Sequence, residues 1–107
     1  MIYTTTETIP GREIETVLGI VNGNIVQSKH VGRDIMAGLK GIVGGELKGY
    51  TEMLTEAREI AIERLVQDAA KLNADAVVGI RFTTSAITDG ASELMVFGTA
   101  VKLKASY

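Results

Sequence analysis

Two strand-like segments, residues 17–21 and 94–101, carry apolar or small residues on both of their faces. A small antiparallel sheet covered by one helix normally alternates apolar and polar side chains, because one face stays in water. A chain that breaks this alternation twice needs a cover on each face. The second cover is either a short helix predicted over residues 34–43 or another copy of the chain. Because monomers rarely expose large apolar patches, the pattern favours a homo-oligomer.

Composition narrows the possible partners and compartments. With 107 residues, the chain is treated as a single domain, 1–107. Eleven Lys and Arg against thirteen Asp and Glu disfavour nucleic acid, whose phosphates attract clustered positive charge. The absence of Cys excludes disulfides, thiol nucleophiles and thiolate metal sites. No apolar run of about 20 residues and no signal-peptide pattern are present, so we expect no membrane contact and a cytoplasmic location.

The predicted order of elements is strand, strand, short helix, long helix, strand, strand. Residues 13–29 are strand-like and contain Asn22-Gly23. This dipeptide is typical of a two-residue hairpin turn, but one continuous strand with a bulge at Gly23 fits equally well. Further strands are predicted over residues 75–84 and 91–104. In the first of these, one face is expected to carry Ala76, Val78, Ile80 and Phe82.

The long helix is predicted over residues 46–72, where apolar residues recur at helical spacing. They form two stripes that point in different directions. The first stripe holds Tyr50, Met53, Leu54, Ala57, Ile60 and Ala61, and the second holds Ile62, Leu65, Val66, Ala69 and Leu72. We therefore expect the first half of the helix to pack on the sheet and the second half on something additional. Asn73 suits the left-handed conformation that closes a helix.

Several motifs in fixed order resemble the YbjQ-like family over essentially the whole chain. They are Gly44-Gly45-Glu46 with Tyr50, Glu56-Ala57-Arg58, Ala74-Asp75-Ala76-Val77-Val78-Gly79 with Arg81, and Gly98-Thr99-Ala100-Val101. The resemblance implies an α+β fold, a βαββ subunit with one long helix on an antiparallel sheet, like a dodecin subunit. It also implies a ring, expected to be a pentamer, and favours the continuous bulged strand. The family is uncharacterised, and its customary label is heavy-metal binding.

The chain contains few side chains that bind heavy metals well. Soft metals prefer thiolate and imidazole ligands, whereas this chain has no Cys and one His, His30. His30 is either an exposed residue at a strand end or a ligand gathered from several copies around a ring axis. Four helix carboxylates align at i, i+4, i+7 and i+11: Glu52, Glu56, Glu59 and Glu63. They form a solvated face or a surface for a hard divalent cation or a basic partner, which makes Glu56 a weak metal candidate.

Other candidates for a ligand or interface site lie within the matching motifs. Gly44 and Gly45 are interpreted as a tight helix junction or as a small-ligand loop at a subunit boundary, since no phosphate-binding glycine motif is present. The polar candidates are Glu46, Tyr50, Arg58, Arg81 and Glu93. Arg58 lies between the two helix stripes, so it is expected to be partly buried and paired with Glu46 or Glu93.

These observations favour a non-enzymatic ring that binds a metal ion or small ligand at subunit boundaries. No catalytic residue is nominated, because His30 is the sole imidazole base and no G-x-S-x-G motif exists. The alternative is a structural scaffold ring that engages a protein partner through the acidic helix face. A small enzyme using carboxylate chemistry is a third, less favoured possibility.

Overall fold

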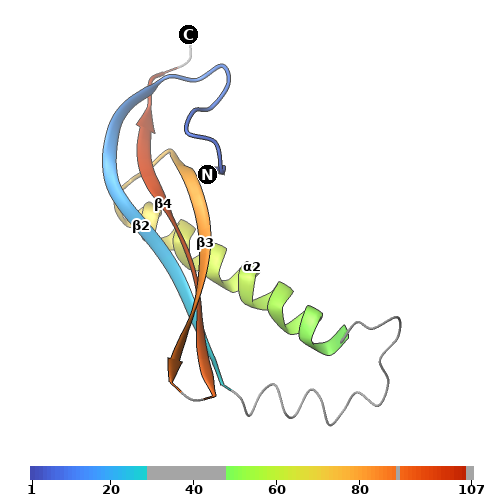
Figure 1. Ribbon diagram of the computed structural model, residues 1–107. Helices are drawn as coiled ribbons and strands as arrows, with labels where there is room; N and C mark the ends of the chain where they lie inside the picture. The colour runs from blue at the N-terminus through green and yellow to red at the C-terminus, as the bar shows by residue number, and fades with distance from the viewer. Residues whose placement is uncertain (29–47, 89, 106–107) are drawn as a thin grey trace.

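The computed structural model describes residues 1–28, 48–88 and 90–105. It contains strands β1 (Ile2–Tyr3), β2 (Ile14–Ser28), β3 (Ala76–Thr88) and β4 (Ala91–Leu103), and helix α2 (Lys48–Lys71). The helix lies across one face of a four-stranded sheet of order β1-β3-β4-β2 (Figure 1). The sheet is mixed rather than purely antiparallel, because β1 runs parallel to β3. The short helix expected over residues 34–43 lies outside the described residues.

Strand β2 is continuous through Asn22 and Gly23, so a hairpin at this dipeptide is wrong. Its register shifts lie nearer its start, between Ile14 and Thr16 and between Val17 and Gly19, rather than at Gly23. Gly23 has a different role. A Cβ there would collide with the carbonyl oxygen of Ala61 and lie 2.5 Å from the amide nitrogen of Leu65. The helix backbone therefore rests directly on the strand backbone at Gly23.

Helix α2 packs on the sheet through one straight line of residues spaced four apart. Each is at most 1% exposed: Ala57, Ala61, Leu65 and Ala69. This line draws on both predicted stripes, so the second half of the helix packs on the sheet as the first does. Ile62 and Val66 of the second stripe are only partly buried, and their additional contact stays a prediction. Small alanine side chains let the helix approach closely, which agrees with the contact at Gly23. The helix closes as expected, with Asn73 at a φ of 58°.

A bulge in β3 reverses the predicted alternation halfway along the strand. Val78 pairs with Thr99 and Arg81 pairs with Phe97, so Gly79 and Ile80 together oppose one residue of β4. Gly79 takes a φ of 63°, which glycine adopts without strain. Ile80 consequently turns to the helix side of the sheet and joins the core there. Its predicted place on one face with Ala76 and Val78 is wrong.

Two cores lie on opposite faces of the sheet. The helix-side core holds Val21, Ala61, Leu65, Ala69, Val77, Ile80, Val96 and Ala100. On the other face, Ala76, Val78, Val101 and Leu103 are covered by Ile9 and Ile14. The expected alternation in β4, with Val96 and Ala100 opposite Val101 and Leu103, is confirmed. We call this doubly covered end of the sheet the base.

We call the other end of the sheet the arm: residues 24–28 of β2, 81–88 of β3 and 91–95 of β4. These strands project away from the base and twist toward the connection between β3 and β4 (Figure 1). Residues 81–88 are almost all exposed. In the described part of the chain, no helix is long and apolar enough to cross a membrane.

Candidate functional site

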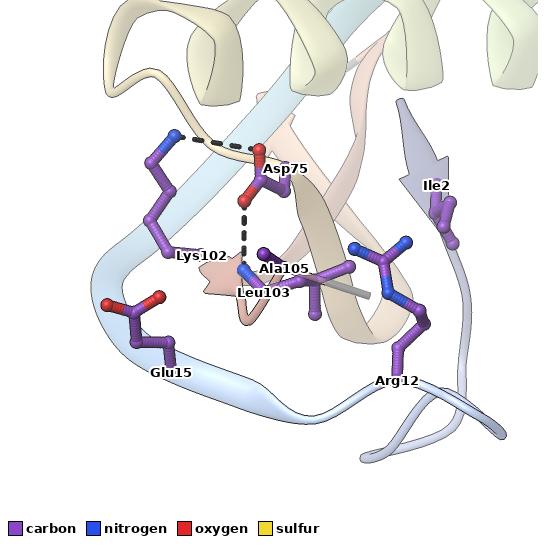
Figure 2. Close-up of a pocket in the computed structure, with 7 residues that line it drawn as sticks. All are labelled: Ile2, Arg12, Glu15, Asp75, Lys102, Leu103 and Ala105. Carbon is purple, nitrogen blue, oxygen red and sulfur yellow. Dashed lines mark hydrogen bonds and ion pairs between the residues drawn. The ribbon is translucent and has the colours of Figure 1, made fainter. Parts of the chain in front are cut away.

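A polar pocket lies at the base, close to where the chain leaves β4. It has a volume of about 580 Å³ and is lined by Ile2, Arg12, Glu15, Asp75, Lys102, Leu103 and Ala105. Figure 2 shows Lys102 and Glu15 on one side, Arg12 and Ile2 on the other, and Asp75 between them. Two cationic and two carboxylate side chains therefore surround one open cleft.

Asp75, which directly precedes β3, makes two of the contacts that shape this pocket. Its Oδ2 accepts a hydrogen bond from the amide of Leu103 at 2.9 Å, and its Oδ1 lies 3.5 Å from Nζ of Lys102. The Leu103 hydrogen bond, aided by the positive charges of Lys102 and Arg12, lowers the pKa of Asp75 against the opposing effect of desolvation. The carboxylate is therefore ionised at neutral pH and fastens the start of β3 to the end of β4.

Arg12 supplies the other cation of the pocket. Its Nη2 donates to the carbonyl of Lys104 at 3.3 Å, which ties the N-terminal segment to the end of β4. Its Nε is buried and has no hydrogen-bond partner among the described residues. The paired charges suit a small polar ligand that carries both signs, whereas Asp75, with its lowered pKa, is a poor general base.

The structure does not gather the predicted site residues into one place. His30, Gly44, Gly45 and Glu46 lie outside the described residues, as does the side chain of Tyr50. Arg58 is exposed, and its Nη2 lies 3.4 Å from Oγ1 of Thr55, so its expected burial is wrong in the single chain. Glu56 is also exposed on α2.

The two predicted strand residues make separate local contacts. Nη1 of Arg81 donates to the carbonyls of Thr5 and Ile80, at 2.9 and 2.8 Å, and holds the N-terminal segment against β3. Oε2 of Glu93 accepts from Nδ2 of Asn24 at 2.9 Å, so in the described part of one chain Glu93 binds Asn24 rather than Arg58. Within one chain, both residues therefore make hydrogen bonds that hold neighbouring segments to the sheet.

The pocket residues were not predicted as a site. Asp75 lies within a family motif, but the motifs do not include Arg12, Glu15 or Lys102. The missing information was the strand order, because β4 lies between β3 and β2 and so brings Asp75, Lys102 and Glu15 together. An Asp at the start of one strand and a Lys in a later strand occur in many sequences, so this pattern alone does not predict the pocket.

One long helix on one face of a mixed four-stranded sheet defines a small α+β domain. The chain belongs to the YbjQ-like family: the family model described as "Putative heavy-metal-binding" matches residues 1–104. This membership agrees with the resemblance in the sequence motifs.

Similar proteins cover the chain almost end to end. A UPF0145 protein of Vibrio campbellii is 75% identical over 103 residues, which are 96% of this chain and 99% of that protein. A UPF0145 protein of Thermotoga maritima is 59% identical over 104 residues, 97% and 98% of the two chains. A crystal structure of a DUF74-family protein of unknown function from Pediococcus pentosaceus matches with a TM-score of 0.66. It covers 97% of this chain and 98% of that one at 16% identity, so this likeness concerns the fold alone.

The donor set of the described residues does not fit a heavy metal within one chain. The sequence has no Cys, and its one His lies outside the described part. Residues 1–28, 48–88 and 90–105 contain no group of three His, Cys, Asp or Glu side chains placed to hold a metal ion. A soft-metal site in this part of the structure would need donors from more than one copy.

Proposed function

We propose that the protein is a homo-oligomeric ring, a pentamer as the YbjQ-like resemblance implies, which binds a metal ion or small ligand where subunits meet. The observation that carries the proposal is the uncovered apolar surface along β2. Val17, Ile20 and Val26 are 65%, 80% and 56% exposed in the described structure. Fully burying such a side chain is worth about 1.5–3 kcal/mol, so a neighbouring copy gains by covering them.

The dimensions of the chain support the same proposal. Its Cα radius of gyration is 17.3 Å, whereas a compact domain of this length has about 13 Å. An extended subunit buries less of its own surface and leaves more for contacts between copies. The absence of Cys agrees with a cytoplasmic, reducing location.

The proposal of ligand binding at subunit boundaries is supported by the separate positions of the candidate side chains in one chain. Among the described residues of one chain, Arg58 binds Thr55, Arg81 binds Thr5, and Glu93 binds Asn24, so the three do not meet one another. The described part of a single chain also lacks a metal-binding group of side chains. In a ring, each boundary joins two different surfaces, so donors that are far apart in one subunit meet across it.

The test is native mass spectrometry combined with light scattering on protein purified without chelator. We expect a pentamer of the 11.4 kDa chain that carries additional bound mass, which elemental analysis and denaturing chromatography then identify. A monomer at micromolar concentration would reject the ring. An assembled ring that carries no added mass and does not bind Zn²⁺, Mg²⁺ or Ca²⁺ in calorimetry would reject the metal-binding proposal.

A scaffold ring that engages a protein partner is the second candidate. Its supporting observation is that all four aligned carboxylates are exposed on α2: Glu52, Glu56, Glu59 and Glu63. We expect salt-sensitive binding of a polylysine peptide that is lost when all four are replaced by Gln. Equal binding by the matched variant would reject this role.

A further inference from the structure

The outer edges of the sheet expose main-chain hydrogen-bonding groups. Natural proteins usually guard such edges with charges, bulges or a covering segment, because an unguarded edge pairs with any available strand. In the order β1-β3-β4-β2, the outer side of β2 forms one edge, and β3 forms the other wherever β1 does not cover it.

The edge of β3 is covered only at its beginning. Thr4 donates to the carbonyl of Val77 and accepts from the amide of Ile80, at 3.0 and 3.1 Å. Gly79 donates to Thr6 at 2.9 Å. From Phe82 to Thr88, no backbone bond from the described residues reaches the outer side. This stretch contains no charged residue, and Phe82 and Ile87 are 43% and 54% exposed.

The edge of β2 is guarded in its middle by two side chains one turn apart on α2. Oδ2 of Asp68 accepts from the amide of Asn22 at 3.1 Å. Nη1 of Arg64 donates to the carbonyl of Asn24 at 2.6 Å. Preceding this guard, residues 16–21 carry no charge and include the exposed Val17 and Ile20. Among the hydrogen bonds of the described chain, none caps the outer side of residues 16–21.

We propose that residues 82–88 of one copy pair edge to edge with residues 16–21 of the next copy. The uncharged stretches 16–21 and 82–88 have similar lengths, whereas the other uncharged part of β2, residues 25–28, is shorter. The first two stretches belong to opposite edges of the sheet, so the contact is heterologous and repeats from copy to copy until a ring closes. The proposal rests on the ring proposed above and names the surfaces that build it.

The geometry of the sheet sets the direction of this junction. Both β2 and β3 run antiparallel to β4, so they run parallel to each other, and their junction in a cyclic ring is a parallel ladder. Residues 82–88 belong to the arm, whereas residues 16–21 lie nearer the base. The strands must therefore be staggered between copies, as the tilted strands of a closed sheet are.

Cross-linking between two single-cysteine chains tests the pairing directly, because the chain has no Cys of its own. Ile20 pairs with Thr99 and Thr83 pairs with Met95, so both side chains lie on the face away from α2. Ile20→Cys and Thr83→Cys chains, one of them mass-tagged, are unfolded, mixed, refolded and treated with a short bismaleimide. Ser85→Cys replaces Thr83→Cys in a second mixture to allow for the register.

We expect cross-linked dimers of one tagged and one untagged chain in the mixtures and none in either chain alone. Thr83→Cys chains that cross-link to themselves would overturn the proposal in favour of two-fold pairing of β3 edges. An assembled ring without mixed cross-links in either mixture would also overturn it, while leaving the ring itself intact. A monomeric wild type would defeat both the ring and the pairing.

A proline substitution tests the same edge independently. The amide of Ile80 points to the outer side of β3, so the amide of Thr84 points the same way two pairs further on. Thr84→Pro removes a donor that β4 does not use, whereas the control Thr84→Val keeps it. We expect the proline variant to shift from the ring to the 11.4 kDa monomer and the valine variant to stay assembled. A proline variant with wild-type circular dichroism that still forms the ring would contradict the proposal.

Discussion

The base and the arm belong to the same sheet but differ in how much of their surface the chain itself covers. At the base, α2 covers one face, and Ile9 and Ile14 cover the other, so β3 and β4 are buried on both sides, while Val17 and Ile20 of β2 stay exposed. At the arm, nearly every residue from 81 to 88 is exposed. The base can be stable within one chain, whereas the arm has apolar side chains and strand edges that only another molecule can cover. Substitutions of residues buried under these covers should therefore act on folding, and substitutions of exposed apolar residues and strand edges should act on assembly.

The largest effect is expected at the contact between helix and strand. Gly23→Val places a side chain against backbone atoms of Ala61 and Leu65, which cannot move aside as a flexible side chain could. We expect a loss of about 3 kcal/mol or more in the free energy of unfolding, measured by urea titration at fixed protein concentration. Asn24→Ser is the neighbouring control, and a Gly23→Val protein of wild-type stability would refute the close approach.

Truncation of a base core residue comes next. Leu65 is fully buried between α2 and the sheet, so Leu65→Ala should cost about 2–5 kcal/mol of unfolding free energy. The matched substitution Leu54→Ala, on the exposed side of the same helix, should cost far less. Equal losses would mean that the helix packs through another face.

Truncation of Ile20 should reverse this pattern. Ile20→Ala removes a side chain that is 80% exposed in one chain, so it should change the stability of an isolated subunit by about 0.5 kcal/mol or less. It should weaken assembly instead, shifting the dissociation midpoint in dilution experiments followed by light scattering. If unfolding suffers and assembly does not, Ile20 is covered within its own chain.

The smallest effect concerns pH. Folding lowers the pKa of Asp75 below its ordinary value of 3.8, so its stabilising contribution is complete above that value. The contribution is lost as the pH falls through the lower pKa of the folded state. Asp75→Asn should therefore flatten the dependence of stability on pH below about pH 4. Glu59→Gln, at an exposed helix position, is the control, and an unchanged acid limb in Asp75→Asn would exclude this linkage.

Local patterns predicted the elements that depend on neighbouring residues. Helical spacing located α2, the left-handed preference of Asn73 located its end, and period-two alternation separated Val96 and Ala100 from Val101 and Leu103. In contrast, the bulge at Gly79 and Ile80 was missed, because an unbroken alternation from Ala76 to Phe82 fits the sequence equally well. The family motifs indicated the right family, but they nominated Arg58, Arg81 and Glu93, which bind three separate partners in the described part of one chain rather than one another.

Hydrophobic periodicity alone specified a long amphipathic helix and strands with too much apolar surface for one cover, since both properties depend on residues close together in the chain. The three-dimensional arrangement specified the rest: the parallel pairing of β1, the seat of Ala61 and Leu65 over Gly23, and the meeting of Arg12, Asp75 and Lys102. These features join segments far apart in the chain, and whether a glycine there serves a turn, a bulge or a close contact depends on which backbone lies above it.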